Sequence, residues 1–189
     1  MIALAAIPLA LVLVGPAIVS AASFTLEPQQ RTEALRMGAD SVTRDTFDTE
    51  WRVANQAGES LTIMTPFHRL VLAARNAAFK NEPMKENEPD KLLREQQDRL
   101  VIWANLLGRR EDFAKFYAPR IVVGDHEIEP TFVQNERTAL RTEGGGYLAR
   151  CVYTFPVKEI APKGRVILVV RDPDGRDVSR FTIDLASMR

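Results

Sequence analysis

"LTIMTPFHRLVLAARNAAFKN" (residues 61–81) contains a change of hydrophobic period that decides the fold expected for this chain. The residues up to Met64 are β-prone, whereas apolar residues after Pro66 recur at helical spacing. Thr65 can cap a helix, and Pro66 suits the first helical position, where an N–H would be unpaired in any case. We therefore predict a strand that ends at Met64 and a helix that begins at Pro66.

One face of this helix is expected to be buried. Its apolar positions are Phe67, Leu70, Val71, Ala74 and Ala78, with Leu72 and Phe79 at the margins. A second helix is predicted from Pro89 to Leu107, with Gly108 as its C-terminal stop. Its expected buried stripe is Leu93, Leu100, Val101, Ala104 and Leu107, and the opposite charges Lys91–Glu95, Arg94–Asp98 and Glu95–Arg99 are spaced four apart. The two helices should form an antiparallel pair at about 66–108.

The residues on either side of this helical pair have the patterns of short antiparallel strands. "TEWRVAN" and "ESLTIM" flank the turn "NQAG", and "RVILVV" and "VSRFTIDL" flank "RDPDGRD". In "YLARCVYTF", alternate residues from Tyr147 to Phe155 share one side, and Phe181, Ile183 and Leu185 do the same near residue 189. The predicted fold class is therefore α+β, an antiparallel immunoglobulin-like β-sandwich with an inserted helical pair, in a single domain over residues 50–189.

The first 26 residues carry no charged side chain and no histidine. An apolar run, the helix-breaking Gly15–Pro16 and the small residues "VSAAS" predict a secretory signal peptide at residues 1–22, with cleavage after Ala21 or Ala22. The alternative is an uncleaved membrane anchor within residues 1–24, since about 20 apolar residues span a bilayer. Pro8, Pro16 and the small residues favour cleavage. We expect a periplasmic or cell-envelope protein.

Residues 23–49 form a weakly patterned arm. The segment "EPQQRTEALRMG" fits either a short helix that opens at Pro28 and closes at Gly38 or an irregular structure. The balanced charge of 25 basic and 25 acidic residues gives no field to attract nucleic acid. The single cysteine, Cys151, lies in an alternating strand pattern and is expected to be a small buried apolar residue.

Three residues at the start of the first predicted helix are candidates for ligand binding. His68, Arg69 and Arg75 could hold an anion near the positive end of this helix. The alternative is that the segment is only a helix start and that His68 lies at the edge of the packed face. No catalytic residue is assigned, because the chain has no G-x-S-x-G, H-E-x-x-H, P-loop or G-x-G-x-x-G pattern.

A second polar cluster lies in "VVGDHEIEP". In an extended segment Asp125, Glu127 and Glu129 share one face and His126 points to the other. Such carboxylates are typical of an exposed strand, so we expect neither a metal nor a cofactor there.

These observations favour an exported, non-catalytic interaction or structural module. Its expected partner is another envelope protein or a second copy of the chain. The alternative is a carrier of a small apolar or anionic ligand, with a groove where the helical pair rests on the sheet and His68 or Arg75 at its mouth.

Overall fold

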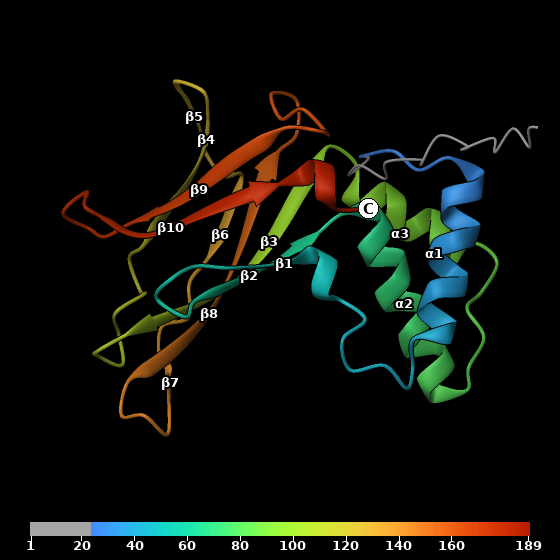
Figure 1. Cartoon of the computed structure of the whole chain (residues 1–189), viewed down its shortest axis with the longest axis horizontal. Helices are drawn as coiled ribbons and strands as arrows, with labels where there is room; N and C mark the ends of the chain where they lie inside the picture. The colour runs from blue at the N-terminus through green and yellow to red at the C-terminus, as the bar shows by residue number, and fades with distance from the viewer. Residues whose placement is uncertain (1–23) are drawn as a thin grey trace, which may run out of the picture.

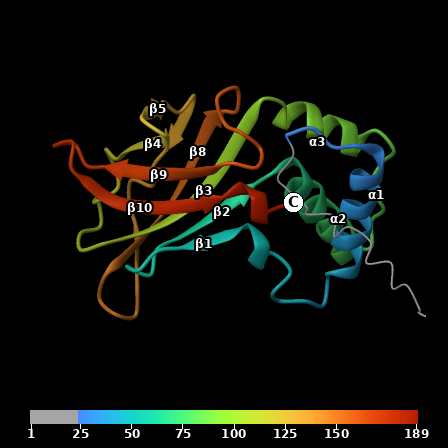
Figure 2. The same ribbon diagram turned by 45° about the horizontal axis from the view of Figure 1, so that its top comes forward.

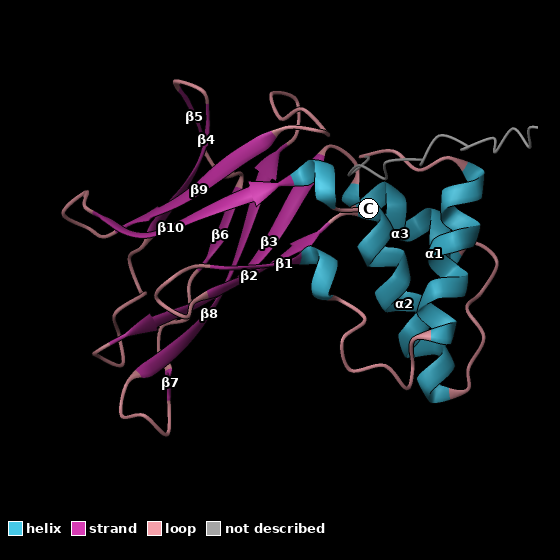
Figure 3. Ribbon diagram, viewed as in Figure 1, coloured by secondary structure: helices cyan, strands magenta, loops and turns pink. Residues whose placement is uncertain are grey.

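The computed structural model describes residues 24–189. The described chain is an α+β protein, with its helices gathered at one end and its strands in two antiparallel sheets at the other (Figures 1 and 3). The predicted leader at residues 1–22 lies outside the described residues. No helix within residues 24–189 combines the length and the hydropathy needed to span a membrane.

The helices are α1 (Pro28–Asp40), α2 (Pro66–Lys80) and α3 (Glu88–Gln96), with short 3-10 turns η1 (Thr49–Trp51) and η2 (Leu185–Ser187). Sheet A contains β1 (Arg52–Ala54), β2 (Ser60–Met64), β3 (Arg99–Gly108), β8 (Tyr147–Pro156) and β6 (Phe132–Gln134) in that spatial order, and β7 (Leu140–Arg141) also pairs with β8. Sheet B has the order β10 (Asp177–Asp184), β9 (Arg165–Arg171), β4 (Ala118–Val123) and β5 (His126–Ile128). Figure 2 shows both sheets extending away from the helices.

The two sheets share one hydrophobic core, and alternate residues of their long strands fill it. The predicted inward positions on β8 and at the end of the chain are confirmed: Ala149, Cys151, Tyr153, Phe155, Phe181, Ile183 and Leu185 are all buried. The β1–β2 and β9–β10 hairpins are also confirmed. At the β9–β10 turn Gly175 has φ +80°, the left-handed conformation that glycine adopts without strain.

A buried carboxylate links the two sheets at the end that is far from the helices. Glu59 lies in the β1–β2 turn and is 5% exposed. One of its oxygens accepts the backbone N–H of Leu107 at 3.1 Å in sheet A and the hydroxyl of Ser179 at 3.0 Å in sheet B. The other accepts the side-chain amide of Asn55 at 2.7 Å. These hydrogen bonds compensate for removing the carboxylate from water.

The predicted transition from strand to helix at residues 64–66 is confirmed. Strand β2 ends at Met64, and Pro66 occupies the first turn of α2. The hydroxyl oxygen of Thr65 accepts the backbone N–H of His68 at 3.1 Å, which satisfies one of the free donors of the first turn. Phe67, Leu70, Val71 and Ala74 are buried as expected, whereas Ala78 and Phe79 are exposed because the sheets do not extend to the end of α2.

The predicted second helix is wrong over its C-terminal half. α3 ends at Gln96, Asp98 has φ +59°, and residues 99–108 form β3. The buried residues are Leu100, Ile102, Ala104 and Leu106, which alternate, so Leu107 is exposed and Val101 is only half-buried. The segment becomes a strand because β2 and β8 both hydrogen-bond to it and because Val, Ile and Trp favour a pleated surface. Of the predicted charge pairs, Lys91–Glu95 is present at 4.0 Å.

The helix that lies alongside α2 comes from the N-terminal arm. Pro28–Asp40 is helical, so of the two alternatives for this segment, a short helix or an irregular structure, the helix is confirmed. The prediction that α2 pairs with a long second helix at residues 89–107 is wrong. Gly38 allows α1 and α2 to approach closely. A Cβ at this position would meet the Val71 carbonyl oxygen and would lie 2.6 Å from the Cβ of Ala74 and 3.0 Å from the backbone N of Arg75.

We expect Gly38→Ala to lower the free energy of unfolding by about 1–3 kcal/mol, because the added methyl group must push the helices apart. The gain in helix propensity, about 1 kcal/mol, offsets only part of this cost. Urea denaturation measures the change. Gly144→Ala is the control, since a methyl group there meets nothing within 4 Å. Equal stability of Gly38→Ala and the wild-type protein would contradict this close packing of α1 on α2.

Candidate functional site: a groove between the helices and sheet A

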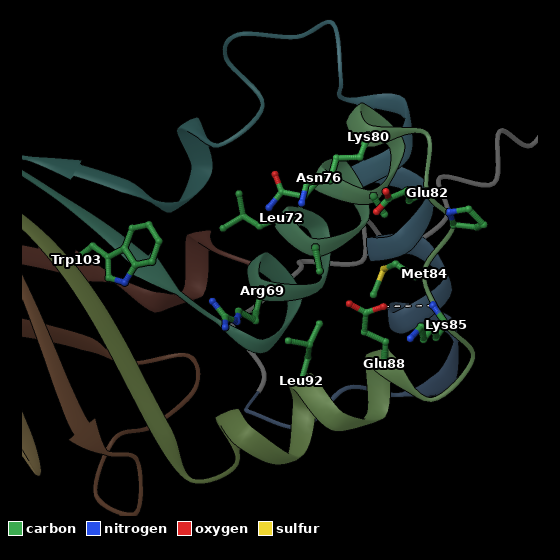
Figure 4. A pocket seen from close by; sticks show the side chains of 13 residues that line it. Arg69, Leu72, Asn76, Lys80, Glu82, Met84, Lys85, Glu88, Leu92 and Trp103 are labelled. Atoms are coloured by element: carbon green, nitrogen blue, oxygen red, sulfur yellow. Dashed lines mark hydrogen bonds between the residues drawn. The ribbon is translucent and has the colours of Figure 1, made fainter.

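A groove of about 680 Å³ lies between α2, α3, the connection between them and the outer face of β3 (Figure 4). The connection leaves α2 at Asn81, whose left-handed conformation (φ 54°) ends the helix while its N–H bonds back to Ala77 and Ala78. It returns to α3 at Glu88, whose carboxylate accepts the backbone N–H of Lys85 at 3.2 Å. The cap at the end of α2 and the hydrogen bond between Lys85 and Glu88 therefore shape this side of the groove.

The walls of the groove are mixed in character. The apolar side chains are Leu72, Ala73, Ala77, Pro83, Met84, Leu92 and Trp103. The polar side chains are Arg69, Asn76, Lys80, Glu82, Lys85 and Glu88. Three cations against two carboxylates give the lining an excess of positive charge, while the apolar residues provide surface for a hydrocarbon group.

Trp103 joins the groove to the outer face of sheet A, here defined by Val101, Trp103, Phe132 and Val152. Trp103 pairs with Val152 across β3 and β8, and both Val101 and Phe132 pair with Thr154. Directly paired residues lie on the same side of a sheet, so these four side chains lie on one face, with Thr154 between Val101 and Phe132. Trp103 is 46% exposed and Phe132 is 50% exposed. The sequence prediction missed this surface because it placed Val101 and Trp103 in a helix.

The three predicted ligand-binding residues point to three different surroundings. Arg69 lines the groove, where Figure 4 shows it near Leu72, Leu92 and Trp103. The guanidinium carbon of Arg75 lies 4.1 Å from the ring centre of Phe47. The same group donates hydrogen bonds to Ser41 and Arg44, so Arg75 holds the segment after α1 against α2. His68 is 1% exposed and faces the core. The structure therefore does not bring the three residues together around one anion.

His68 is packed more deeply than the edge position expected from the sequence. Its ring stacks on Trp51 with 4.1 Å between centroids and 4° between planes. Nδ1 lies 3.0 Å from the carbonyl oxygen of Ile63, so this nitrogen carries the proton and donates it. Nε2 is the single buried side-chain nitrogen or oxygen in the described part of the chain that has no hydrogen-bond partner. Burial lowers the pKa of His68, because the charged imidazolium would be removed from water.

The polar cluster at residues 125–129 is divided among separate ion pairs. His126 Nε2 lies 2.8 Å from Glu159, Glu127 lies 2.6 Å from Arg171, and Glu129 lies 3.0 Å from Arg120. Within residues 24–189, no three histidine, cysteine or acidic side chains converge to hold a metal ion. Cys151 is buried in the core, and burial raises the pKa of its thiol.

No protein-family model, curated protein or solved structure matches this chain. The arguments for function therefore rest on the geometry of the groove and of the outer face of sheet A.

The lowered pKa of His68 predicts a loss of stability in mild acid. Above the unfolded pKa of about 6.5, His68 is neutral in both states and the full stability is present. As the pH falls below this value, the unfolded chain binds a proton that folded His68 does not bind, so the free energy of unfolding declines by up to about 1.4 kcal/mol per pH unit from this residue. The decline should continue until the pH reaches the folded pKa.

Urea denaturation at pH 7.5 and pH 5.5 checks this prediction. His68→Gln should reduce the difference in the free energy of unfolding between the two pH values, because it removes the buried imidazole. An unchanged difference in His68→Gln would contradict the assignment. If His68→Gln does not fold, an NMR titration of the wild-type ring should show a His68 pKa below its ordinary value of about 6.5.

Proposed function

We propose that the chain is an exported, non-catalytic interaction module of the cell envelope, and that its partner docks on the outer face of sheet A. The exposed Trp103 is the observation that supports this proposal best. Tryptophan is enriched among the residues that dominate binding energy in protein interfaces, and Trp103 lies between the apolar surface of the sheet and a groove. Exposed apolar surface of this kind marks interaction sites.

The surroundings of Trp103 suit a protein partner. Thr62 and Gln134 lie in the same cross-strand row as Trp103 and Val152, so polar side chains border the apolar centre on both sides. This arrangement of an apolar centre within a polar rim is typical of protein interfaces. The partner that we propose is another envelope protein or a second copy of the chain; nucleic acid is not proposed, because the charges of the chain balance.

An immunoglobulin-like topology for the two sheets is part of the same proposal, as is export by a leader that is cleaved after Ala21 or Ala22. The two antiparallel sheets around one core support the first point, and the sequence pattern of residues 1–22 supports the second. If the leader is retained, it would serve as a membrane anchor.

A second candidate function is a carrier of a small apolar or anionic ligand. The groove supports it, since about 680 Å³ lies within the usual range for small-molecule sites and the walls combine apolar and cationic side chains. In this candidate function Arg69, rather than His68 or Arg75, is the cationic residue that would contact an anionic ligand.

Photo-crosslinking in intact cells tests the interaction module. A photoreactive phenylalanine analogue at position 103 or 132 should give an adduct of one discrete mass, because both positions contact the same partner. Positions 79 and 116 are the controls, since Phe79 is 77% exposed and Phe116 is 66% exposed but both lie outside the proposed surface. Twice the monomer mass would identify a second copy. Equal adducts at all four positions, or none at 103 and 132, would contradict the proposal.

The location of the protein is checked on the same cells by intact mass. The recovered chain should begin at Ala22 or Ser23. A product that retains Ile2 would contradict export with cleavage and would favour the anchor.

A further inference from the structure

We propose that the groove binds a single-chain carboxylate amphiphile, a fatty-acid-like anion, with its carboxylate on Arg69 and its hydrocarbon chain against Leu72, Leu92 and Trp103. This inference rests on the second candidate function, the ligand carrier, and names the chemical class of its ligand.

The first argument is that the guanidinium of Arg69 has no hydrogen-bond or ion-pair partner among the described residues. Six arginines within residues 24–189 are half-buried. Five of them hold a carboxylate or a backbone carbonyl: Arg31, Arg75, Arg120, Arg171 and Arg189. The guanidinium of Arg69 alone has no hydrogen bond or ion pair with any described residue. The guanidinium of Arg69 is therefore free to bind a ligand, and a carboxylate would satisfy two of its parallel N–H groups at once.

The second argument is the position of Arg69 among apolar side chains. Figure 4 shows it on the side of the groove where Leu72, Leu92 and Trp103 lie, away from Glu82 and Glu88 beside the α2–α3 connection. A carboxylate at Arg69 therefore avoids both acidic side chains. A hydrocarbon chain attached to it would cover leucine and indole surface, which removes apolar area from water at roughly 25 cal/mol per Å².

The third argument is charge complementarity over the whole lining. Lys80 and Lys85 add positive charge at the connection end of the groove, and no side-chain ion pair between them and other described residues neutralises it. One oxygen of the Glu88 carboxylate accepts the backbone N–H of Lys85, and the lining as a whole has three cationic side chains against two acidic ones. The field in the groove thus favours an anion over a neutral or cationic amphiphile of the same length.

Fluorescence and calorimetric titrations of the folded protein with decanoate test the proposal. Decanol and decyltrimethylammonium are the comparisons, since they have the same chain length but a neutral or cationic head group, and all three are used below their critical micelle concentrations. The chain has two tryptophans, and Trp51 is fully buried, so a blue shift on binding should come from Trp103. Trp103→Phe should remove the shift while calorimetry still detects heat. Decanoate should bind more tightly than the other two compounds.

Arg69→Met keeps an unbranched apolar stem and removes the guanidinium group, so it should weaken decanoate binding roughly 10- to 100-fold, the effect of one charge-assisted hydrogen-bonded pair. It should leave decanol binding nearly unchanged. Arg36→Met is the matched control, since Arg36 is an exposed helical arginine outside the groove, and it should bind decanoate as the wild-type protein does.

Two results would overturn the proposal in different ways. Equal binding of all three compounds, unaffected by Arg69→Met, would reject the carboxylate site and leave an apolar carrier. Binding of none of them would reject both the site and the carrier, and the interaction module would still be tested separately by crosslinking at position 103.

Discussion

The stacked rings of Trp51 and His68 are the contact on which the arrangement of the helices and sheets depends. Trp51 precedes β1, and His68 lies in the first turn of α2, so their stack holds the helical end of the molecule against sheet A. The carbonyl oxygen of Ile63 in β2 accepts the Nδ1–H of His68, which fixes the orientation of the ring. Removing two large aromatic surfaces from water supplies a few kcal/mol of stabilisation, and the hydrogen bond makes the geometry specific.

Residue 189 completes this junction. Its backbone oxygen accepts hydrogen bonds from the indole N–H of Trp51 at 2.8 Å and from the Thr65 hydroxyl. The Arg189 guanidinium binds Glu50 at 2.6 Å and Glu33 in α1 at 2.9 Å. Segments from both ends of the described chain therefore meet at the start of α2.

The junction also determines what the groove presents. Once His68 faces Trp51, the next residue of the helix is turned by about 100° toward the side of α3 and β3, which places Arg69 in the groove. Arg75 falls two turns later and faces the segment after α1. The positions of the three residues thus follow from one fixed side chain and the period of the helix.

Local patterns predicted the parts of the fold that depend on neighbouring residues. The Thr65 cap, the turn "RDPDGRD" between β9 and β10 and the alternation in β8 are of this kind, since each is decided within a few residues. Residues 99–108 fit either a helix or a strand, and their state is decided by pairing with β2 and β8, which are distant in the sequence. Trp103 is exposed because this segment is a strand. A prediction that made the segment a helix therefore could not find the surface that supports the proposed function.

The candidate site was also predictable only where neighbouring residues decide the structure. The sequence pointed to the first turns of α2 and named Arg69, but it did not distinguish a buried His68 from an exposed one. That difference is set by Trp51, which lies 17 positions earlier and whose contact with α2 has no local signal in the sequence.

The most direct test of this account asks whether the helices and sheets unfold as one unit. In the Trp103→Phe variant the fluorescence reports Trp51 at the junction alone, and circular dichroism at 222 nm reports mainly the helices. The account predicts that both signals follow one urea transition with the same midpoint, as in two-state unfolding. Loss of the helical signal at a clearly lower urea concentration than the Trp51 signal would show that the junction does not couple the helices to the sheets.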